Sequence, residues 1–232
     1  MRLLEAIAAR LARTDMLQGV ALLFVALAFT LAIQWPTGSI VANQSWFTVA
    51  PVRLTLLAIG AMAWGGGLGA RATSPRGPAD AERIDLPGFG TREWRAESRA
   101  TLGALLVLVP LTLPFELTTH AASYPDVSFA WSLGVPLLAV MGYFGAGLLL
   151  GRLTDTLRVS FLLALLVPLL FAGSAWLDVS LGRTVLNPWT ASLAVSVPYA
   201  AALCVLALVT VALLIGRSRR GLDGTSGASA QA

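Results

Sequence analysis

The chain has 232 residues, of which 56% are hydrophobic and 12% are charged. Soluble globular chains carry about 25% charged residues, so this composition excludes an ordinary soluble domain and indicates a membrane protein. The formal net charge of +4 comes from arginine alone, because the sequence contains no lysine. Since a P-loop and a Schiff-base site both need lysine, we expect the chain neither to hydrolyse ATP itself nor to bind a pyridoxal cofactor.

Residues 1–15 are predicted to form an amphipathic helix that lies on the membrane surface. In "MRLLEAIAARLAR" the leucines and Ile7 fall on one helical face, whereas Arg10 and Arg13 fall largely elsewhere. A cleaved signal peptide is the alternative. It is disfavoured because the next apolar run, Met16 to Trp35, is as long as a full membrane span and longer than the core of a signal.

Six membrane-spanning helices follow, so the predicted fold class is an all-α, polytopic six-helix bundle. The expected spans are 16–35, 51–70, 100–118, 128–150, 159–177 and 191–216. They make up a transmembrane domain over 16–216. A cytoplasmic loop over 71–99 interrupts this domain, and a disordered cytoplasmic tail over 217–232 follows it.

The arginines give this bundle an orientation. Only two of the sixteen, Arg53 and Arg183, fall on one side of the predicted bundle. Arginine is enriched in cytoplasmic loops, so we expect both termini in the cytoplasm. Tryptophans that mark a membrane interface gather at the opposite, outer ends: Trp35, Trp46, Trp131, Trp176 and Trp189. The arginine- and alanine-rich composition is typical of a bacterial chain, which places the protein in the cell inner membrane.

Small residues recur at four-residue spacing in two spans. The second span carries Ala61, Gly65 and Gly69, and the fourth carries Gly147 and Gly151. Such stripes let helix backbones approach closely in lipid. They predict close packing either within the bundle or between two protomers.

An acid and the one histidine of the chain lie near the outer end of the third span. Glu116 and His120 are four residues apart, so they share a helical face. Together with Asp178, at the outer end of the fifth span, they are predicted to line an outward-facing substrate path. The alternative is an interfacial acid that is satisfied by headgroup water, by Arg53 or by Arg183.

The longest loop ends in a predicted helical segment, "TREWRAES", for which Thr91 is a plausible N-cap. Its charges alternate in helical register, and Phe89 and Trp94 are expected to be exposed aromatic anchors of the kind that protein interfaces use. The residues predicted to dock a partner protein are Arg92, Glu93, Trp94 and Arg95. The alternative is a solvated connector whose aromatic side chains dip into the lipid headgroups.

No catalytic signature is found. The sequence lacks a nucleophile elbow and a zinc-binding helix motif, and every acid falls near a membrane face. A single cysteine, Cys204, and a single histidine leave no pair for a redox or haem site. We therefore expect no enzyme activity, no metal site, no cofactor and no nucleic-acid partner.

The architecture resembles the permease subunits of type-2 ABC exporters. The resemblance is mainly topological: an amphipathic entry helix, six spans with both ends inside, a charged loop after the second span, and a hydrophobic outer segment, Leu177 to Leu193. It implies a coupling helix at Thr91 to Ser98 that docks on a separate ATPase subunit, and an outer gate at Leu181 to Trp189. It also implies a homodimer that moves a hydrophobic or amphipathic substrate.

Two other functions fit the same sequence. One is an ion-coupled secondary transporter that uses Glu116 and His120, which needs no ATPase. The other is a non-catalytic assembly subunit of a larger membrane complex, with the small-residue stripes as its contact surfaces.

Overall fold

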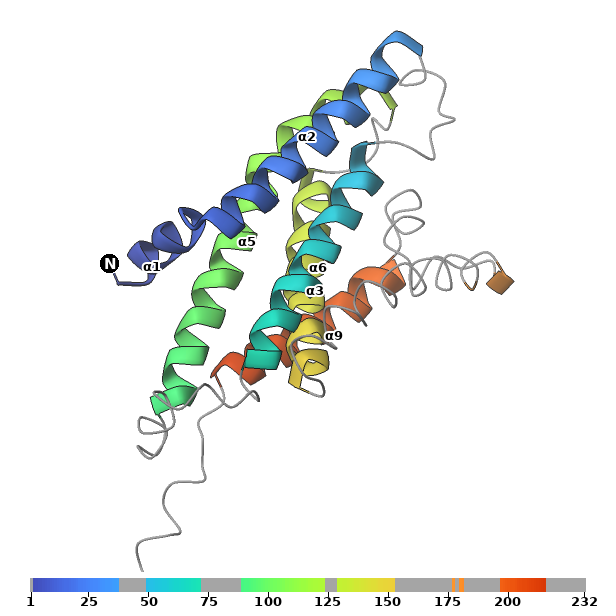
Figure 1. The fold of residues 1–232 in the computed structure, drawn as a ribbon. Helices are drawn as coiled ribbons and strands as arrows, with labels where there is room; N and C mark the ends of the chain where they lie inside the picture. The colour runs from blue at the N-terminus through green and yellow to red at the C-terminus, as the bar shows by residue number, and fades with distance from the viewer. Residues whose placement is uncertain are drawn as a thin grey trace, which may run out of the picture.

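The computed structural model describes residues 2–37, 49–71, 89–123, 129–152, 177, 180–181 and 197–215 (Figure 1). Within these ranges the chain is helical and has no strand. Its six helices are α1 (Arg2–Leu11), α2 (Thr14–Thr37), α3 (Val49–Arg71), α5 (Phe89–Ser123), α6 (Phe129–Arg152) and α9 (Val197–Ile215). All but α1 are long and apolar enough to cross a membrane, as in a multi-pass membrane protein.

These five helices correspond to the first four and the last of the predicted spans. The fifth predicted span, 159–177, lies outside the described residues except for Leu177, and so does the tail over 217–232. Of the segment expected as an outer gate, only Leu181 is described. The third span differs from expectation, because α5 begins at Phe89 rather than near residue 100.

The helices α3 and α6 lie side by side at the centre of the bundle (Figure 1) and pack backbone to backbone. A Cβ atom built on any of four glycines would overlap backbone atoms of the opposite helix; these glycines are Gly65, Gly69, Gly147 and Gly151. Only residues without side chains permit this approach. The predicted small-residue stripes therefore pack against each other within one chain.

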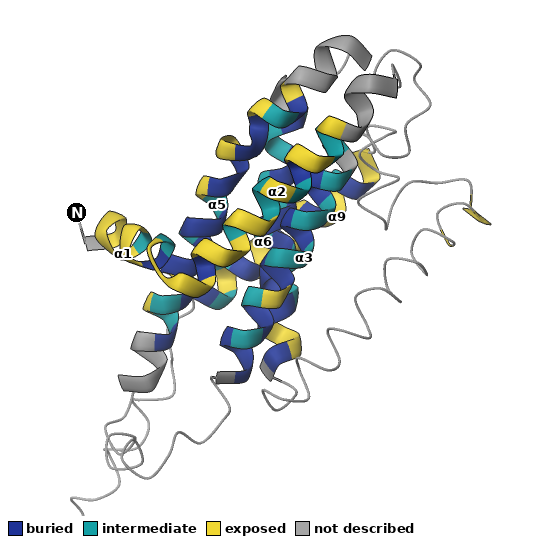
Figure 2. Ribbon diagram, turned by 45° about the horizontal axis from the view of Figure 1, so that its top comes forward, coloured by how far each residue is buried: buried dark blue, intermediate teal, exposed yellow. Residues whose placement is uncertain are grey.

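The apolar core lies between α3, α5 and α6, whereas α2 and α9 cover it from outside (Figure 2). One stripe of α9 is buried, and it consists of Tyr199, Leu203, Ala207, Thr210 and Leu214. The hydroxyl of Thr210 donates a hydrogen bond of 2.9 Å to the Met141 carbonyl of α6. Other apolar side chains of α9 and much of α2 are exposed, which suits contact with lipid rather than water.

The first turns of α5 hold the ends of two other helices. Trp94 Nε1 donates a hydrogen bond of 2.7 Å to the carbonyl of Leu68, in the last turn of α3. Arg99 Nη2 donates one of 2.6 Å to the carbonyl of Leu214, in the last turn of α9. The last four carbonyls of a helix have no partner within it, so both bonds satisfy otherwise orphaned acceptors. Trp94 is consequently buried, and the expectation that it is exposed is wrong.

The short helix α1 projects from the side of the bundle (Figures 1 and 2). Ile7 and Leu11 pack on the core, and Ile7 lies against Gly103 of α5. Leu3 and Leu4 remain exposed. Arg10 is buried, although the helical pattern had placed it away from the apolar face. The location of α1 on a membrane surface stays a prediction.

Candidate functional site

A fully buried arginine, Arg53, lies within the apolar part of α3 that could span a membrane. An ionised side chain in hydrocarbon is unfavourable, so such residues are rare and are paired where they occur. The surroundings of Arg53 are therefore the first place to look for function.

The guanidinium of Arg53 contacts two other helices. Its Nε donates to Thr112 Oγ1 at 2.9 Å, and its Nη2 donates to the Val109 carbonyl of α5 at 2.6 Å. Its Nη1 donates to the Ser132 carbonyl of α6 at 3.1 Å and also pairs with Glu116 Oε2. We call these five residues the Arg53 cluster. It joins α3, α5 and α6 through one side chain.

The sequence of α5 places its three members of the Arg53 cluster on one face. Val109, Thr112 and Glu116 are spaced by three and four residues, which is one helical turn each time. The Thr112 hydroxyl donates its own proton to the backbone, with the Leu108 carbonyl 2.9 Å away. Its oxygen is thereby free to accept from Arg53, as a hydroxyl has one donor and two acceptor positions.

The charges of the Arg53 cluster balance within it. Glu116 is only 5% exposed, and its carboxylate contacts the guanidinium directly. Buried charges of this kind are tolerated when they are paired and hydrogen-bonded. The Ser132 hydroxyl is also buried, and it has no hydrogen-bond partner among the described residues. One polar group beside the ion pair thus has bonding capacity for a substrate, an ion or water.

The structure brings one of the three predicted path residues into this cluster. Glu116 pairs with Arg53, which was one of the alternatives for satisfying it. The backbone of His120 lies one turn further along α5, while its side chain lies outside the described part of the chain, as does Asp178. The shared substrate path of these three residues stays a prediction.

The predicted docking residues all lie in the first turns of α5. Trp94 is held against α3, and Arg95 is half-buried. The side chains of Arg92 and Glu93 are not among those described. Their role in binding a partner is untested.

Sequence reasoning named Arg53 as a charge on the outer side and as one possible partner of Glu116, but not as the centre of the site. A signal was present in "PVRLTLLAIG", where one arginine stands in an otherwise apolar helical run. An ionisable residue in such a run is by default a candidate for function. The role of Thr112 carried no comparable signal.

Among the described residues, no group of three or more His, Cys, Asp or Glu side chains could hold a metal ion. No family model, curated protein or solved structure matches this chain. A function for it therefore rests on its own residues.

Proposed function

We propose that the chain is the permease subunit of an ATP-driven exporter of the type-2 ABC class, working with a separate ATPase subunit. The observation that carries the proposal is the continuity of α5. This helix has 35 residues and is about 50 Å long, whereas a bilayer core is about 30 Å thick. One continuous helix, which contains Pro110 and Pro114 at the level of the Arg53 cluster, thus joins that cluster to the charged segment before the third span.

The bonds at the start of α5 would pass a movement there to the rest of the bundle. Trp94 and Arg99 attach this segment to the last turns of α3 and α9. The arginine bias puts this end in the cytoplasm, where a motor subunit would bind. A push on Arg92, Glu93 or Arg95 would then reach three spans at once.

A separate ATPase is required because the chain has no lysine for a P-loop. In this proposal two copies of the chain form the pathway for a hydrophobic or amphipathic substrate. Glu116, His120 and Asp178 lie along its outer part. The apolar surfaces of α2 and α9 that no described residue covers are available to lipid and to the second copy.

The test is co-purification of the tagged chain, expressed with its neighbouring genes and extracted in gentle detergent. We expect the wild-type chain to retain an ATPase, and the double variant Arg92→Glu, Arg95→Glu to lose it. The matched control is Arg219→Glu, Arg220→Glu, which makes the same charge change in the predicted cytoplasmic tail. A wild-type chain that never retains an ATPase contradicts the proposal, as does equal loss in both variants.

A second function, ion-coupled transport, is favoured by the Arg53 cluster itself. An acid in contact with a buried arginine, next to a Ser132 hydroxyl without a partner among the described residues, is the kind of paired ionisable group that marks ion pathways and proton relays in membranes. It predicts flux driven by a pH gradient in vesicles that hold this chain alone, and loss of that flux in Glu116→Gln. The absence of flux together with stable retention of other membrane proteins would instead identify an assembly subunit.

A further inference from the structure

The long helix α5 contains two prolines one turn apart, Pro110 and Pro114. Proline has no backbone N–H, so the helix bonds that would end at the carbonyls of Leu106 and Pro110 cannot form. Each ring also crowds the carbonyl one turn before it, and prolines are common sites of bends in long helices. The helix nonetheless continues to Ser123. Its backbone is therefore least supported around the two prolines.

The two prolines lie on the outer face of α5. Pro110 and Pro114 are both exposed, whereas Val109, Thr112 and Glu116 are buried on the other side of the same turns. Lipid has no donor that could replace the missing backbone bonds on the outer face. Support for this part of the helix must then come from the buried face.

The bonds of Arg53 provide that support on both sides of the prolines. Its Nη2 donates to the Val109 carbonyl, just before the first proline, at 2.6 Å. Its Nε donates to Thr112 Oγ1, between the prolines, at 2.9 Å. Its Nη1 pairs with Glu116, after the second proline. One guanidinium thus fixes the segments before, between and after the prolines relative to each other.

The side chain of Arg53 is itself anchored on two helices. Arg53 belongs to α3, whose backbone is in direct contact with that of α6. Its Nη1 also donates to the Ser132 carbonyl of α6 at 3.1 Å. The guanidinium therefore holds α5 against a pair of helices that moves as one unit.

The end of α5 beyond the prolines lies at the edge of the bundle. The Phe115 ring meets Phe24 of α2 edge-on, with 5.5 Å between the ring centroids, and α2 is itself largely exposed. Leu117 is 41% exposed. Glu116 attaches this end to the α3–α6 pair through Arg53.

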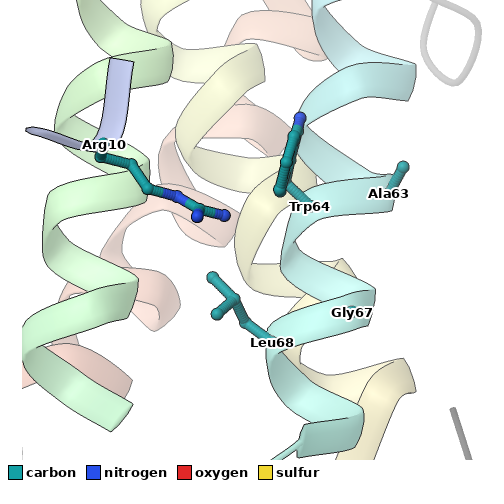
Figure 3. A pocket seen from close by; sticks show the side chains of 5 residues that line it. All are labelled: Arg10, Ala63, Trp64, Gly67 and Leu68. Atoms are coloured by element: carbon teal, nitrogen blue, oxygen red, sulfur yellow. The ribbon is translucent and has the colours of Figure 1, made fainter. Parts of the chain in front are cut away.

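The other buried arginine, Arg10 of α1, contacts α5 in a part that has no proline. Its Nε donates a hydrogen bond of 3.0 Å to Thr101 Oγ1, and its guanidinium carbon lies 4.7 Å from the centre of the Trp64 ring. It borders a pocket of about 290 Å³ (Figure 3), which is also lined by Ala63, Trp64, Gly67 and Leu68. Because the helix bonds of α5 are complete here, Arg10 fixes α1 on the bundle but spans no weak point of α5.

We propose that Pro110 and Pro114 form a hinge in α5 and that Arg53 is its lock. With the Glu116 contact in place, the end of α5 is fixed on α3 and α6. Without that contact, the residues after the prolines swing away from the pair. His120 of the proposed substrate path lies on the end that swings. The hinge itself does not depend on the proposed transport function, since all its parts belong to this chain.

The experiment measures the distance between two nitroxide labels by pulsed electron paramagnetic resonance, in the full chain reconstituted in lipid vesicles. The exposed Cys204 is first replaced by serine, so that labels attach only at chosen positions. The reference label is placed by Val197→Cys, at the exposed start of α9. This position lies at the same end of the bundle as the hinge, because Tyr199 and Leu54 belong to one core cluster.

The second label reports on α5 either beyond or before the hinge. Ala122→Cys places it in the last turn of the helix, beyond both prolines. Val107→Cys places it before both prolines, at a position that is 38% exposed and can hold a label. A change that is seen only from Ala122 then reports a movement at the prolines.

The lock is removed by Arg53→Met together with Glu116→Leu, which leaves neither charge without a partner. Glu116→Gln is measured beside it, because it removes the negative charge with the least change in shape. The matched control is Arg13→Met together with Glu97→Leu. That pair also joins an arginine to an acid of α5, at 3.8 Å, but it lies before the prolines.

We expect one narrow distance for each label pair in the wild type and in the control. Removal of the lock should shift the Ala122–Val197 distance by about 5 Å, because a change of about 20° at the prolines acts on an arm of about 15 Å. Glu116→Gln should shift a fraction of the molecules in the same way. The Val107–Val197 distance should stay as it is in all variants.

Adding Pro110→Ala and Pro114→Ala to the unlocked protein should restore the narrow distance, since both backbone bonds can then form. An Ala122–Val197 distance that changes neither without the lock nor in Glu116→Gln overturns the proposal. So does an equal shift in the control or from Val107, and so does a shift that persists after the prolines are replaced.

Discussion

The two buried arginines use the same side chain in two different ways. Arg53 is fully enclosed and contacts an acid that is itself buried. Arg10 faces an acid that is 41% exposed and that it shares with Arg13, and it borders a pocket. The first arrangement is a closed joint between helices, whereas the second lies beside a pocket and pairs with an acid that solvent reaches. The burial of the partner and the space beside the guanidinium decide the role, not the burial of the arginine alone.

The largest effect is expected when the closed joint loses its acid. Glu116→Leu leaves the guanidinium of Arg53 buried without its counter-charge, so the free energy of unfolding should fall by about 3–5 kcal/mol. Unfolding in mild detergent with added SDS, followed by circular dichroism, measures this. The double variant Arg53→Met, Glu116→Leu should recover much of the loss. If the double variant is no more stable than Glu116→Leu alone, the loss does not come from an unpaired Arg53 charge.

The two arginines can be compared through one substitution made at each. Thr112 and Thr101 are both fully buried, and each accepts a hydrogen bond from an arginine Nε. Replacement by valine keeps the shape and removes the acceptor. We expect the free energy of unfolding to fall by about 2 kcal/mol for Thr112→Val and by about 1 kcal/mol for Thr101→Val. The loss is larger at Thr112 because the fully enclosed Arg53 Nε finds no other acceptor. The same unfolding measurement compares the two variants. A larger loss for Thr101→Val than for Thr112→Val would show that Arg53 is not the more enclosed of the two arginines.

A smaller effect isolates the aromatic contact of Arg10. A double-mutant cycle with Arg10→Gln and Trp64→Leu should give a coupling energy of about 0.5–1 kcal/mol, since Trp64 is only half-buried. The stability of all four proteins provides the cycle. Strictly additive losses would mean that Trp64 acts through packing alone.

The smallest effect is expected at Asp15, the acid beside Arg10. Asp15→Asn keeps the oxygen that accepts from the Met16 amide and removes only the charge. Exposed ion pairs contribute about 0.2–1 kcal/mol, and salt weakens them further. The loss of unfolding free energy should therefore stay below that of Glu116→Gln and shrink as NaCl is added. A salt-independent loss as large as that of Glu116→Gln would show that Asp15 and Glu116 contribute equally to the free energy of unfolding.

Five of the six predicted spans match long apolar helices in the described part of the chain, because apolar length is a local property. The helices α2, α3 and α6 begin and end within a few residues of their expected limits. The helical segment predicted over Thr91 to Ser98 is present, but it begins at Phe89, before the predicted N-cap Thr91, and is continuous with the third span. Its polar first turns carry no apolar signal, and the bonds of Trp94 and Arg99 to α3 and α9 hold them in place.

The candidate site was only half visible in the sequence. Glu116 was singled out, whereas Thr112, which lies one turn before it on the same helix face, was not. The pairing with Arg53 joins residues that are 63 positions apart, so no local pattern specified it and it stood only as one option among several. Arg10 was misjudged for the same reason. Its acceptor, Thr101, lies 91 residues away, and helical periodicity reports a face but not what another helix brings to it.

The glycine contact between α3 and α6 also limits how this protein can change shape. Two backbones in direct contact cannot rotate or slide past each other without steric overlap. The pair must then move as a single unit in any conformational change. Relative motion is then expected where α2 and α9 pack on this pair, because those contacts are made by side chains that can change rotamer.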